Sequence, residues 1–187
     1  MSAPRTDVEQ VERANTAFYE ALETGDFEGL SSLWLAPLDT VGDNDDTDTD
    51  TDTDTDTDTD NNDNADEGEG EEARISCVHP GWPVLNGRGE VLRSYALIMA
   101  NTEYIQFFLT DVHVSVAGDT ALVTCTENIL SGGPAPDDGD ELGPLVGQLV
   151  VATNVFRRTG DGWKLWSHHA SPVLAESGEE EDEETPG

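Results

Sequence analysis

An alternating Thr-Asp tract, which runs from Thr47 to Asp60, places the strongest constraint on how this chain can fold. The alternation imitates a β-strand, but it puts an unneutralised carboxylate on the same side at every second residue. Repulsion between these groups excludes a stable sheet. We therefore expect residues 43–72 to form a disordered acidic insert and residues 176–187 a disordered acidic tail. The folded domain must come from residues 1–42 and 73–175.

Those two acidic segments hold 23 of the 41 Asp and Glu residues, in a chain whose formal net charge is −33. Such an acid excess repels nucleic acids and anionic membranes. The first residues, MSAPRTDVEQ, lack the apolar stretch of a signal peptide, and no apolar run is long enough to span a membrane. We expect a cytoplasmic protein that binds neither nucleic acid nor membrane. We interpret the negative charge as a halophilic adaptation to a high-salt cytoplasm, because salt screens the repulsion between carboxylates.

Hydrophobic residues before the insert follow the period of an amphipathic helix. Apolar positions recur at spacings of three or four from Val8 to Leu22, and Gly25 is placed to end this helix in a left-handed conformation. Asp26 can cap a second helix that reaches Trp34. The same period returns after the insert and predicts a third helix from about residue 87 to residue 101.

The hydrophobic period then changes from the helical value to two, which is typical of strands. Strands are predicted over residues 105–117, 120–130, 146–158 and 162–171, with a shorter one within residues 73–80. Short turns join most of the long strands, so we expect antiparallel neighbours. The chain is therefore predicted to be an α+β protein, in which three N-terminal helices cover one face of a curved antiparallel sheet.

Three stretches carry a resemblance to a known family: VERANTAFYEALETGDFEGLSSLW, SCVHPGWPVLNGRGEVLRSY and VATNVFRRTGDGWKLWSHHASPV. With this order of elements, the chain resembles the nuclear transport factor 2-like superfamily, and in particular its SnoaL-like domain proteins. The resemblance implies a cone-shaped, cystatin-like sheet around a pocket, and frequent homodimers. It implies no single activity, because the superfamily includes ketosteroid isomerases, cyclases, dehydratases, hydrolases and association domains.

Glu127 is the strongest candidate for a catalytic residue. Strand alternation places it on the same side as Val123 and Cys125, on a strand that is otherwise suited to burial. Burial of a carboxylate is costly unless it is paired or protonated, and a raised pKa would make it a general base near neutral pH. The alternative is that Glu127 forms an ion pair with Arg157 or Arg158 on the neighbouring strand.

Histidines supply the other candidate catalytic groups. Because His168 and His169 are adjacent on one strand, only one of them can face a pocket, and alternation together with the resemblance favours His169. His79 is the third candidate, although both His79 and His169 could instead be structural histidines. A zinc site of Cys77, His79, Cys125 and His169 has suitable ligands but lacks the close paired spacing of metal motifs. We expect neither metal nor cofactor.

Trp82, Tyr95 and Asn154 are the candidate ligand-binding residues, suited to a small apolar ligand that contains a carbonyl group. The first functional hypothesis is a pocket that binds such a ligand and catalyses proton transfer of the isomerase, cyclase or dehydratase type. The alternative is a non-catalytic homodimeric binding or association module, with Lys164, Trp166 and Val155 on its outward sheet face. The sequence leaves open whether the protein is an enzyme.

Overall fold

The computed structural model describes residues 6–37, 74–135 and 143–174, so the predicted acidic insert and tail lie outside the described residues. Helix α1 (Asp7–Thr24) begins after Thr6, whose hydroxyl accepts a hydrogen bond from the backbone N–H of Glu9. It ends at Gly25, whose φ of 66° lies in the left-handed region that glycine tolerates best. Asp26 then caps α2 (Phe27–Leu33), as the sequence predicts.

Among the described residues, six strands form one sheet in the order β2-β1-β6-β5-β4-β3. They are β1 (Ser76–Val78), β2 (Leu85–Asn86), β3 (Tyr104–Ala117), β4 (Thr120–Gly132), β5 (Val146–Thr159) and β6 (Gly162–Pro172). The four long strands are antiparallel neighbours, as predicted. In contrast, β1 pairs with β6 in parallel, so the sheet is mixed at that edge. The α+β fold with an open curved sheet is confirmed.

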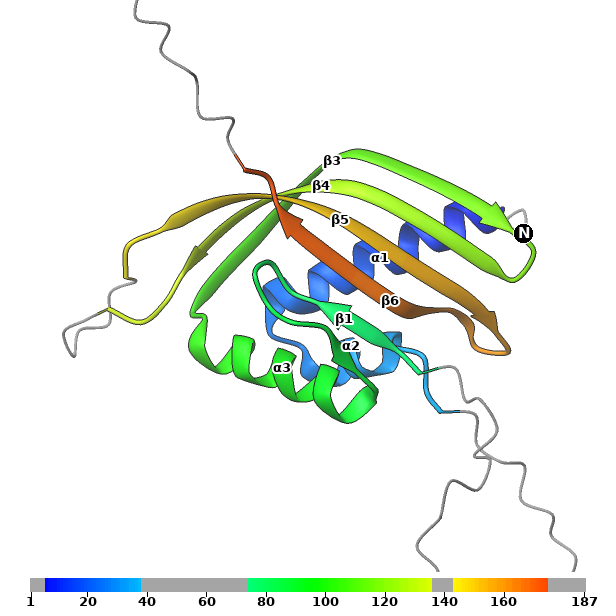
Figure 1. Cartoon of the computed structure of the whole chain (residues 1–187), viewed down its shortest axis with the longest axis horizontal. Helices are drawn as coiled ribbons and strands as arrows, with labels where there is room; N and C mark the ends of the chain where they lie inside the picture. Colours follow the sequence, from blue (N-terminus) through cyan, green and yellow to red (C-terminus); the bar gives the residue numbers. More distant parts are fainter. Residues whose placement is uncertain (1–5, 38–73, 136–142, 175–187) are drawn as a thin grey trace, which may run out of the picture.

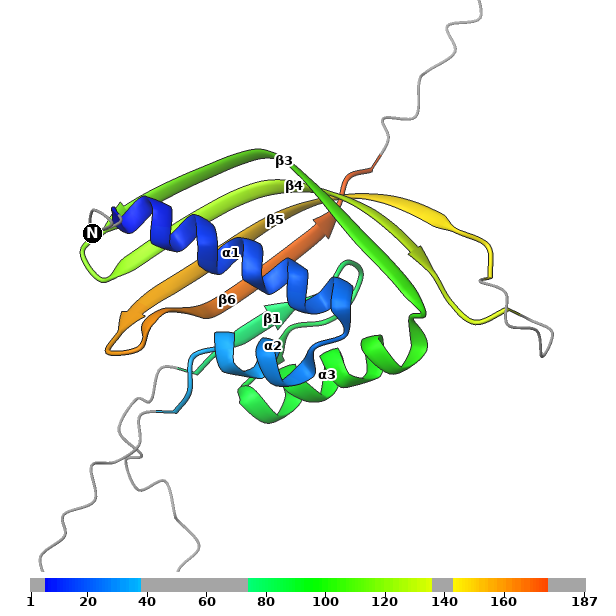
Figure 2. The same ribbon diagram turned by 180° about the vertical axis from the view of Figure 1, so that it is seen from behind.

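The helices lie on the concave side of the curved sheet (Figures 1 and 2). Helix α1 crosses the long strands, and α3 (Arg88–Asn101) lies beyond β1 with α2 close to it. Phe18 of α1 is fully buried in the core, where its ring meets Trp34 and Tyr95 edge-on at centroid distances of 6.2 and 6.0 Å. No helix in the described parts of the chain is long and apolar enough to cross a membrane.

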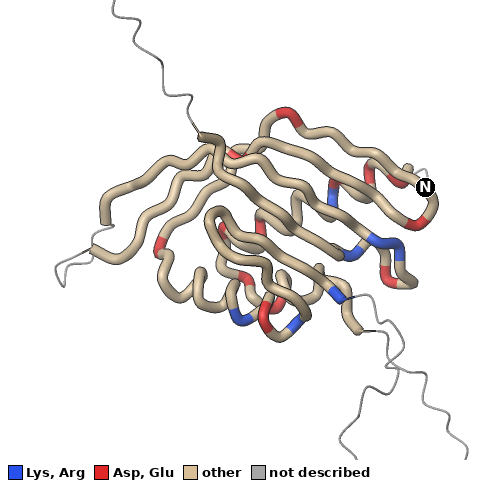
Figure 3. The backbone as a smooth tube through the Cα atoms, in the orientation of Figure 1, with Lys and Arg blue, Asp and Glu red and all other residues tan. Residues whose placement is uncertain are grey.

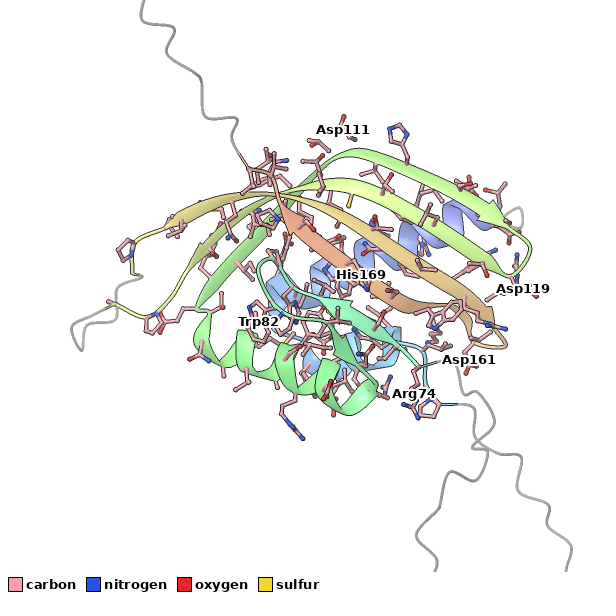
Figure 4. All side chains as sticks on the ribbon, viewed as in Figure 1. Arg74, Trp82, Asp111, Asp119, Asp161 and His169 are labelled. Atoms are coloured by element: carbon pink, nitrogen blue, oxygen red, sulfur yellow. The ribbon has the colours of Figure 1, made fainter. Side chains whose placement is uncertain are left out.

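Two of the long strands carry irregularities that change which way their side chains point. In β3 the register shifts between Thr110 and His113, where Asp111 has a φ of 51° and lies at the bend labelled in Figure 4. In β6, Ser167 pairs with Val155 while Leu165 pairs with Phe156, so Trp166 is an extra residue. Such a bulge reverses the alternation of all residues that follow it.

Candidate functional site

A pocket of about 530 Å³ lies between the helices and the concave side of the sheet. This volume is within the range of small-molecule sites. Residues from α1, α3, β3, β4, β5 and β6 line it, together with the segment after β1. Its buried polar or aromatic lining residues are Tyr19, His79, Tyr95, Glu127 and His168.

Glu127 lies on β4 with its side chain turned into the pocket, and it is only 2% exposed. The Tyr19 hydroxyl donates a hydrogen bond of 2.7 Å to Oε1 of Glu127. The second carboxyl oxygen has no hydrogen-bond partner among the described residues. Burial raises the pKa of Glu127 from 4.5 to about 7, although the Tyr19 hydrogen bond opposes this shift. Near neutral pH the group can therefore accept or release a proton.

The predicted alternative, an ion pair between Glu127 and an arginine of β5, is wrong. Arg158 instead contacts Asp7 at 2.7 Å and Asp119 at 3.1 Å. The guanidinium of Arg157 lies over the ring of Trp166, on the outward side of the sheet. Because no Lys or Arg of the described residues forms a salt bridge with Glu127, no such bridge from this part of the chain holds its carboxylate in the charged form.

A network of side chains supports Tyr19 and Glu127 from behind the pocket. The Asn154 amide nitrogen donates to Oδ1 of Asn15 at 2.8 Å and to the Tyr19 oxygen at 3.1 Å. The Asn154 oxygen lies 2.6 Å from Nδ1 of His168. Asn154 was predicted to bind ligand, but it is fully buried and is absent from the pocket lining. Its side chain contacts Asn15, Tyr19 and His168.

The histidine that faces the pocket from β6 is His168, so the predicted inward orientation of His169 is wrong. The bulge at Trp166 causes this difference, since strict alternation from Leu165 would have turned His169 inward. His169 is exposed, and its Nε2 lies 3.2 Å from the Ser76 hydroxyl (its position is labelled in Figure 4). Burial lowers the pKa of His168 to about 3 and keeps its ring neutral.

His79 enters the pocket from the residue after β1, as predicted, and is buried against α3. Its Nε2 lies 2.7 Å from the Ser94 hydroxyl, and its ring meets Tyr95 edge-on at 4.8 Å. Burial lowers the pKa of His79 to about 4. The predicted zinc alternative gains no support, because the described residues contain no group of three or more metal-ligating side chains.

Two predicted ligand-binding residues do line the pocket. Tyr95 is buried in its wall, while Trp82 lies towards its opening with 43% exposure (labelled in Figure 4). Tyr19 and Asn15, in contrast, had no predicted role in the site. The sequence feature that could have identified them is a pair of polar residues four positions apart on the buried face of α1. A buried polar side chain needs a hydrogen-bond partner.

Comparisons with known proteins agree with this architecture. A family model described as a SnoaL-like domain matches residues 69–176. The chain is similar to a Streptomyces avermitilis protein that is provisionally described as a dehydratase of the nuclear transport factor 2-like family. The two are 72% identical with a TM-score of 0.73, and the match covers 92% of this chain and 100% of the other. None of the curated proteins matches the chain.

More distant structures share the fold alone. A ketosteroid isomerase-like protein from Erwinia carotovora atroseptica is 13% identical with a TM-score of 0.59, and the match covers 92% of this chain and 100% of that one. A nuclear transport factor 2-like superfamily protein from Salmonella enterica is 11% identical with a TM-score of 0.63, and the match covers 93% of this chain and 96% of that one.

Proposed function

This chain belongs to the SnoaL-like family of the nuclear transport factor 2-like superfamily, and we propose that its pocket binds a small apolar ligand on which Glu127 transfers a proton. The observation that carries this proposal is a buried carboxyl group with one oxygen held by Tyr19 and the other without a protein partner. A purely structural carboxylate at this depth would be expected to have both oxygens satisfied.

The chemistry follows from the pKa of Glu127, which is about 7. In the ionised form, Glu127 takes a proton from the carbon beside a ligand carbonyl, and the C–H electron pair forms an enolate. If the same proton returns to another carbon of the conjugated system, a double bond moves and the reaction is an isomerisation. If it is delivered to a hydroxyl group on the next carbon, water leaves and the reaction is a dehydration. Either route restores the starting carboxylate.

The dehydration route is the type named for the similar Streptomyces avermitilis protein. His79 and His168 are neutral at working pH, because burial lowers the pKa of each to about 4 and about 3. They therefore orient a ligand through hydrogen bonds and leave Glu127 as the group that changes charge. Tyr19 keeps its proton, since burial raises the pKa of its phenol far above neutral.

The experiment uses β-tetralone, a neutral bicyclic ketone, as the probe. Exchange of its acidic C–H protons in heavy water is followed by proton NMR with wild-type protein and with Glu127→Gln. We expect wild type to accelerate exchange by about a hundredfold or more over buffer, as general base catalysis does. Glu127→Gln should return the rate to that of buffer.

The matched control is Glu12→Gln, which makes the same chemical change at an exposed position of α1 outside the pocket. It should exchange β-tetralone like wild type. Circular dichroism should show that both variants stay folded. Full exchange activity in Glu127→Gln, or no acceleration by wild type, would reject the proposed function.

A second candidate function, a homodimeric association module, is favoured by the outward face of the sheet. Phe108 and Leu149 are 53% and 46% exposed, and both lie opposite Asn128 in one row across the sheet. Val151, which is 47% exposed, lies on the same face two residues from Leu149. Exposed apolar patches of this kind mark interaction sites. Trp166, part of the predicted surface, contributes less because Arg157 lies over its ring.

Light scattering at micromolar concentration tests this second candidate. We expect a wild-type dimer, and Leu149→Asp should dissociate it because a carboxylate would be buried at the interface. Val84→Asp is the control, since Val84 is also exposed, at 55%, but lies just before β2 at the other edge of the sheet. A wild-type monomer, or a Leu149→Asp dimer, would count against the association surface.

A further inference from the structure

We propose that Asn154 is a positioning residue, which fixes the hydrogen positions of two side chains that line the pocket. It holds the imidazole hydrogen of His168 on Nδ1, and it supports the hydroxyl of Tyr19 as a donor to Glu127. Asn154 belongs to β5, is fully buried and is not part of the pocket lining, so it does not touch a ligand itself. The part that concerns Glu127 rests on the proposed function, whereas the hydrogen position on His168 does not depend on any reaction.

The direction of the hydrogen bonds is set at the Glu127 end. An ionised carboxylate can only accept, so the single hydroxyl hydrogen of Tyr19 points to Oε1 of Glu127 at 2.7 Å. The Tyr19 oxygen therefore presents a lone pair to the Asn154 amide, 3.1 Å away. Only the nitrogen of that amide can donate, so the nitrogen faces Tyr19 and the amide oxygen faces away from it.

Asn15 of α1 holds the Asn154 amide in this same orientation. Its Oδ1 accepts a hydrogen bond of 2.8 Å from the Asn154 nitrogen, so both hydrogens of that nitrogen are used. The three side chains of Asn15, Tyr19 and Asn154 are at most 3% exposed. A rotated amide would turn its oxygen towards two acceptors and would lose two buried hydrogen bonds, which is costly.

The Asn154 oxygen then decides where the hydrogen of His168 lies. This oxygen is 2.6 Å from Nδ1 of His168, and of the two atoms only the imidazole nitrogen can donate. Burial, with His79 and His169 nearby, lowers the pKa of His168 to about 3, so near neutral pH the ring carries a single hydrogen. That hydrogen is therefore on Nδ1 and the lone pair on Nε2, whereas an unconstrained histidine in water prefers the opposite arrangement.

This arrangement determines what His168 offers inside the pocket. Its Nε2 has no hydrogen-bond partner among the described residues. In the same part of the chain, the fully buried side-chain nitrogens without a partner are those of Trp34 and Trp163, so Nε2 of His168 is open to the pocket as an acceptor. Tyr95 supplies the complementary group, since its hydroxyl contacts the weakly accepting Cys77 sulfur at 3.5 Å and keeps a hydrogen for a ligand carbonyl.

The second effect of Asn154 is on the carboxyl group of Glu127, through Tyr19. A hydrogen bond received by the Tyr19 oxygen polarises its hydroxyl and strengthens the bond that this hydroxyl donates to Glu127. Because a bond donated to the carboxylate favours its charged form, Asn154 stabilises ionised Glu127 without touching it.

The other groups around Glu127 do not replace this support. The uncharged ones are Tyr19 of α1, Tyr95 of α3, Cys77 of β1, Cys125 of β4, His79 and His168. Burial keeps them neutral, because it raises the pKa of the hydroxyls and thiols and lowers that of the histidines. Glu23 and Glu103 add negative charge to a lining that has no Lys or Arg among the described residues, and Figure 3 shows a red segment but no blue one where α3 leads into β3.

The first test reads the hydrogen position of His168 in the full wild-type chain. Long-range proton–nitrogen correlation NMR distinguishes a protonated from an unprotonated ring nitrogen, and the spectrum of His168→Gln identifies the signals by their loss. The measurement is made at about pH 8, where Glu127 is ionised. We expect Nδ1 of His168 to be protonated and Nε2 to be unprotonated.

The second test compares Asn154→Asp with Asn154→Leu. Aspartate still accepts the Nδ1 hydrogen of His168, so the hydrogen should stay on Nδ1, whereas in the leucine variant it should move towards Nε2. Neither side chain donates to Tyr19. The pKa of Glu127, followed by carbon-13 NMR, should therefore rise by about half a pH unit in Asn154→Leu and by about one in Asn154→Asp, where a second carboxylate adds repulsion.

Asn128→Leu is the matched control, because its amide bonds lie on the outward face of the sheet, and it should change neither quantity. The wild-type spectrum needs no variant, so it decides the first test even if a substitution at Asn154 prevents folding. A hydrogen on Nε2 of His168 in wild type would overturn the proposal. An unchanged pKa of Glu127 in a folded Asn154→Asp variant would also overturn it.

These outcomes are separable from that of the proposed function, because neither readout needs turnover. If wild type fails to accelerate exchange of β-tetralone while both NMR results are as expected, only the proposed function is wrong. If exchange depends on Glu127 but His168 carries its hydrogen on Nε2, only the positioning role of Asn154 is wrong.

Discussion

The hydroxyl of Tyr19 on α1 donates a hydrogen bond of 2.7 Å to Glu127 on β4, across 108 residues of sequence. The two residues belong to different layers of the fold, so the packing of α1 onto the sheet also fixes the orientation of the carboxyl group. This one hydrogen bond therefore affects both the stability of the fold and the pKa of Glu127.

Tyr19→Phe should shift the pH dependence of β-tetralone exchange to higher pH. The Tyr19 hydrogen bond lowers the pKa of Glu127 against the effect of burial, so its removal raises that pKa above about 7. The measurement is the pH profile of the exchange rate. Tyr104→Phe, which removes a hydroxyl bonded to Gln106 outside the pocket lining, is the control and should leave the profile unchanged. A profile in Tyr19→Phe that stays in place or moves to lower pH contradicts the assignment.

Glu127→Gln should gain stability over wild type as the pH rises. The folded-state pKa of Glu127 is about 7 and its ordinary value is 4.5, so the folded protein holds this proton more tightly than the unfolded chain. The associated stability is fully present below about pH 4.5 and is lost as the pH rises towards 7. The Glu127→Gln variant has no ionisable group at this position, so it does not lose this stability as the pH rises.

The difference in unfolding free energy, variant minus wild type, should therefore increase by about 2 kcal/mol between about pH 5 and about pH 8. Urea denaturation at both pH values measures it. Burial also lowers the pKa values of His79 and His168, which makes stability fall in acid, but both groups are present in both proteins and their effects cancel. Parallel stability curves for the two proteins would show that Glu127 is not buried in this way.

Asn154→Leu should destabilise the protein by about 2 kcal/mol or more, because it leaves buried polar groups of Asn15 and His168 without their partner and removes the hydrogen bond to the Tyr19 oxygen. Urea denaturation measures the loss. Asn128→Leu is the matched control on the outward face of the same sheet, where the amide bonds are partly exposed to water. It should cost well under half as much. Equal losses of unfolding free energy in the two variants would mean that the buried hydrogen bonds of Asn154 contribute no more to stability than the partly exposed ones of Asn128.

The melting temperature of wild type should rise between dilute buffer and molar salt. The formal net charge of −33 makes repulsion between carboxylates a general destabilising force, and salt screens it. Differential scanning calorimetry across a sodium chloride series measures the effect. A melting temperature that does not change with salt would contradict the halophilic interpretation.

Local sequence signals predicted most of the fold. Gly25 and Asp26 act at the helix ends where their residue types indicated caps, and the four long strands begin and end within a few residues of the predicted bounds. The parallel pairing of β1 with β6 could not be predicted in this way, because it depends on how the chain returns to the sheet after the helices. No hydrophobic period within β1 or β6 indicates that these two distant segments become neighbours.

The candidate site was predictable in part, since His79, Trp82 and Tyr95 line the pocket as the sequence predicts. Glu127 stood out as a carboxyl group on a strand suited to burial, and it lies in the pocket. His169 was misplaced because a single bulge at Trp166 reverses the alternation, and no sequence signal marked that bulge. The partnership of Asn154 with Asn15 joins residues 139 positions apart, so it becomes visible only once α1 is packed on the sheet.

The pKa of Glu127, measured by carbon-13 NMR of its side-chain carboxyl group, tests the central claim most directly. The spectrum of Glu127→Gln identifies the resonance, since that signal alone should be missing. A midpoint near 7 is expected for a carboxyl group buried in the pocket without a cation. A midpoint near the ordinary value of 4.5 would show that Glu127 is solvated or paired, and would remove the basis for proton transfer at this site.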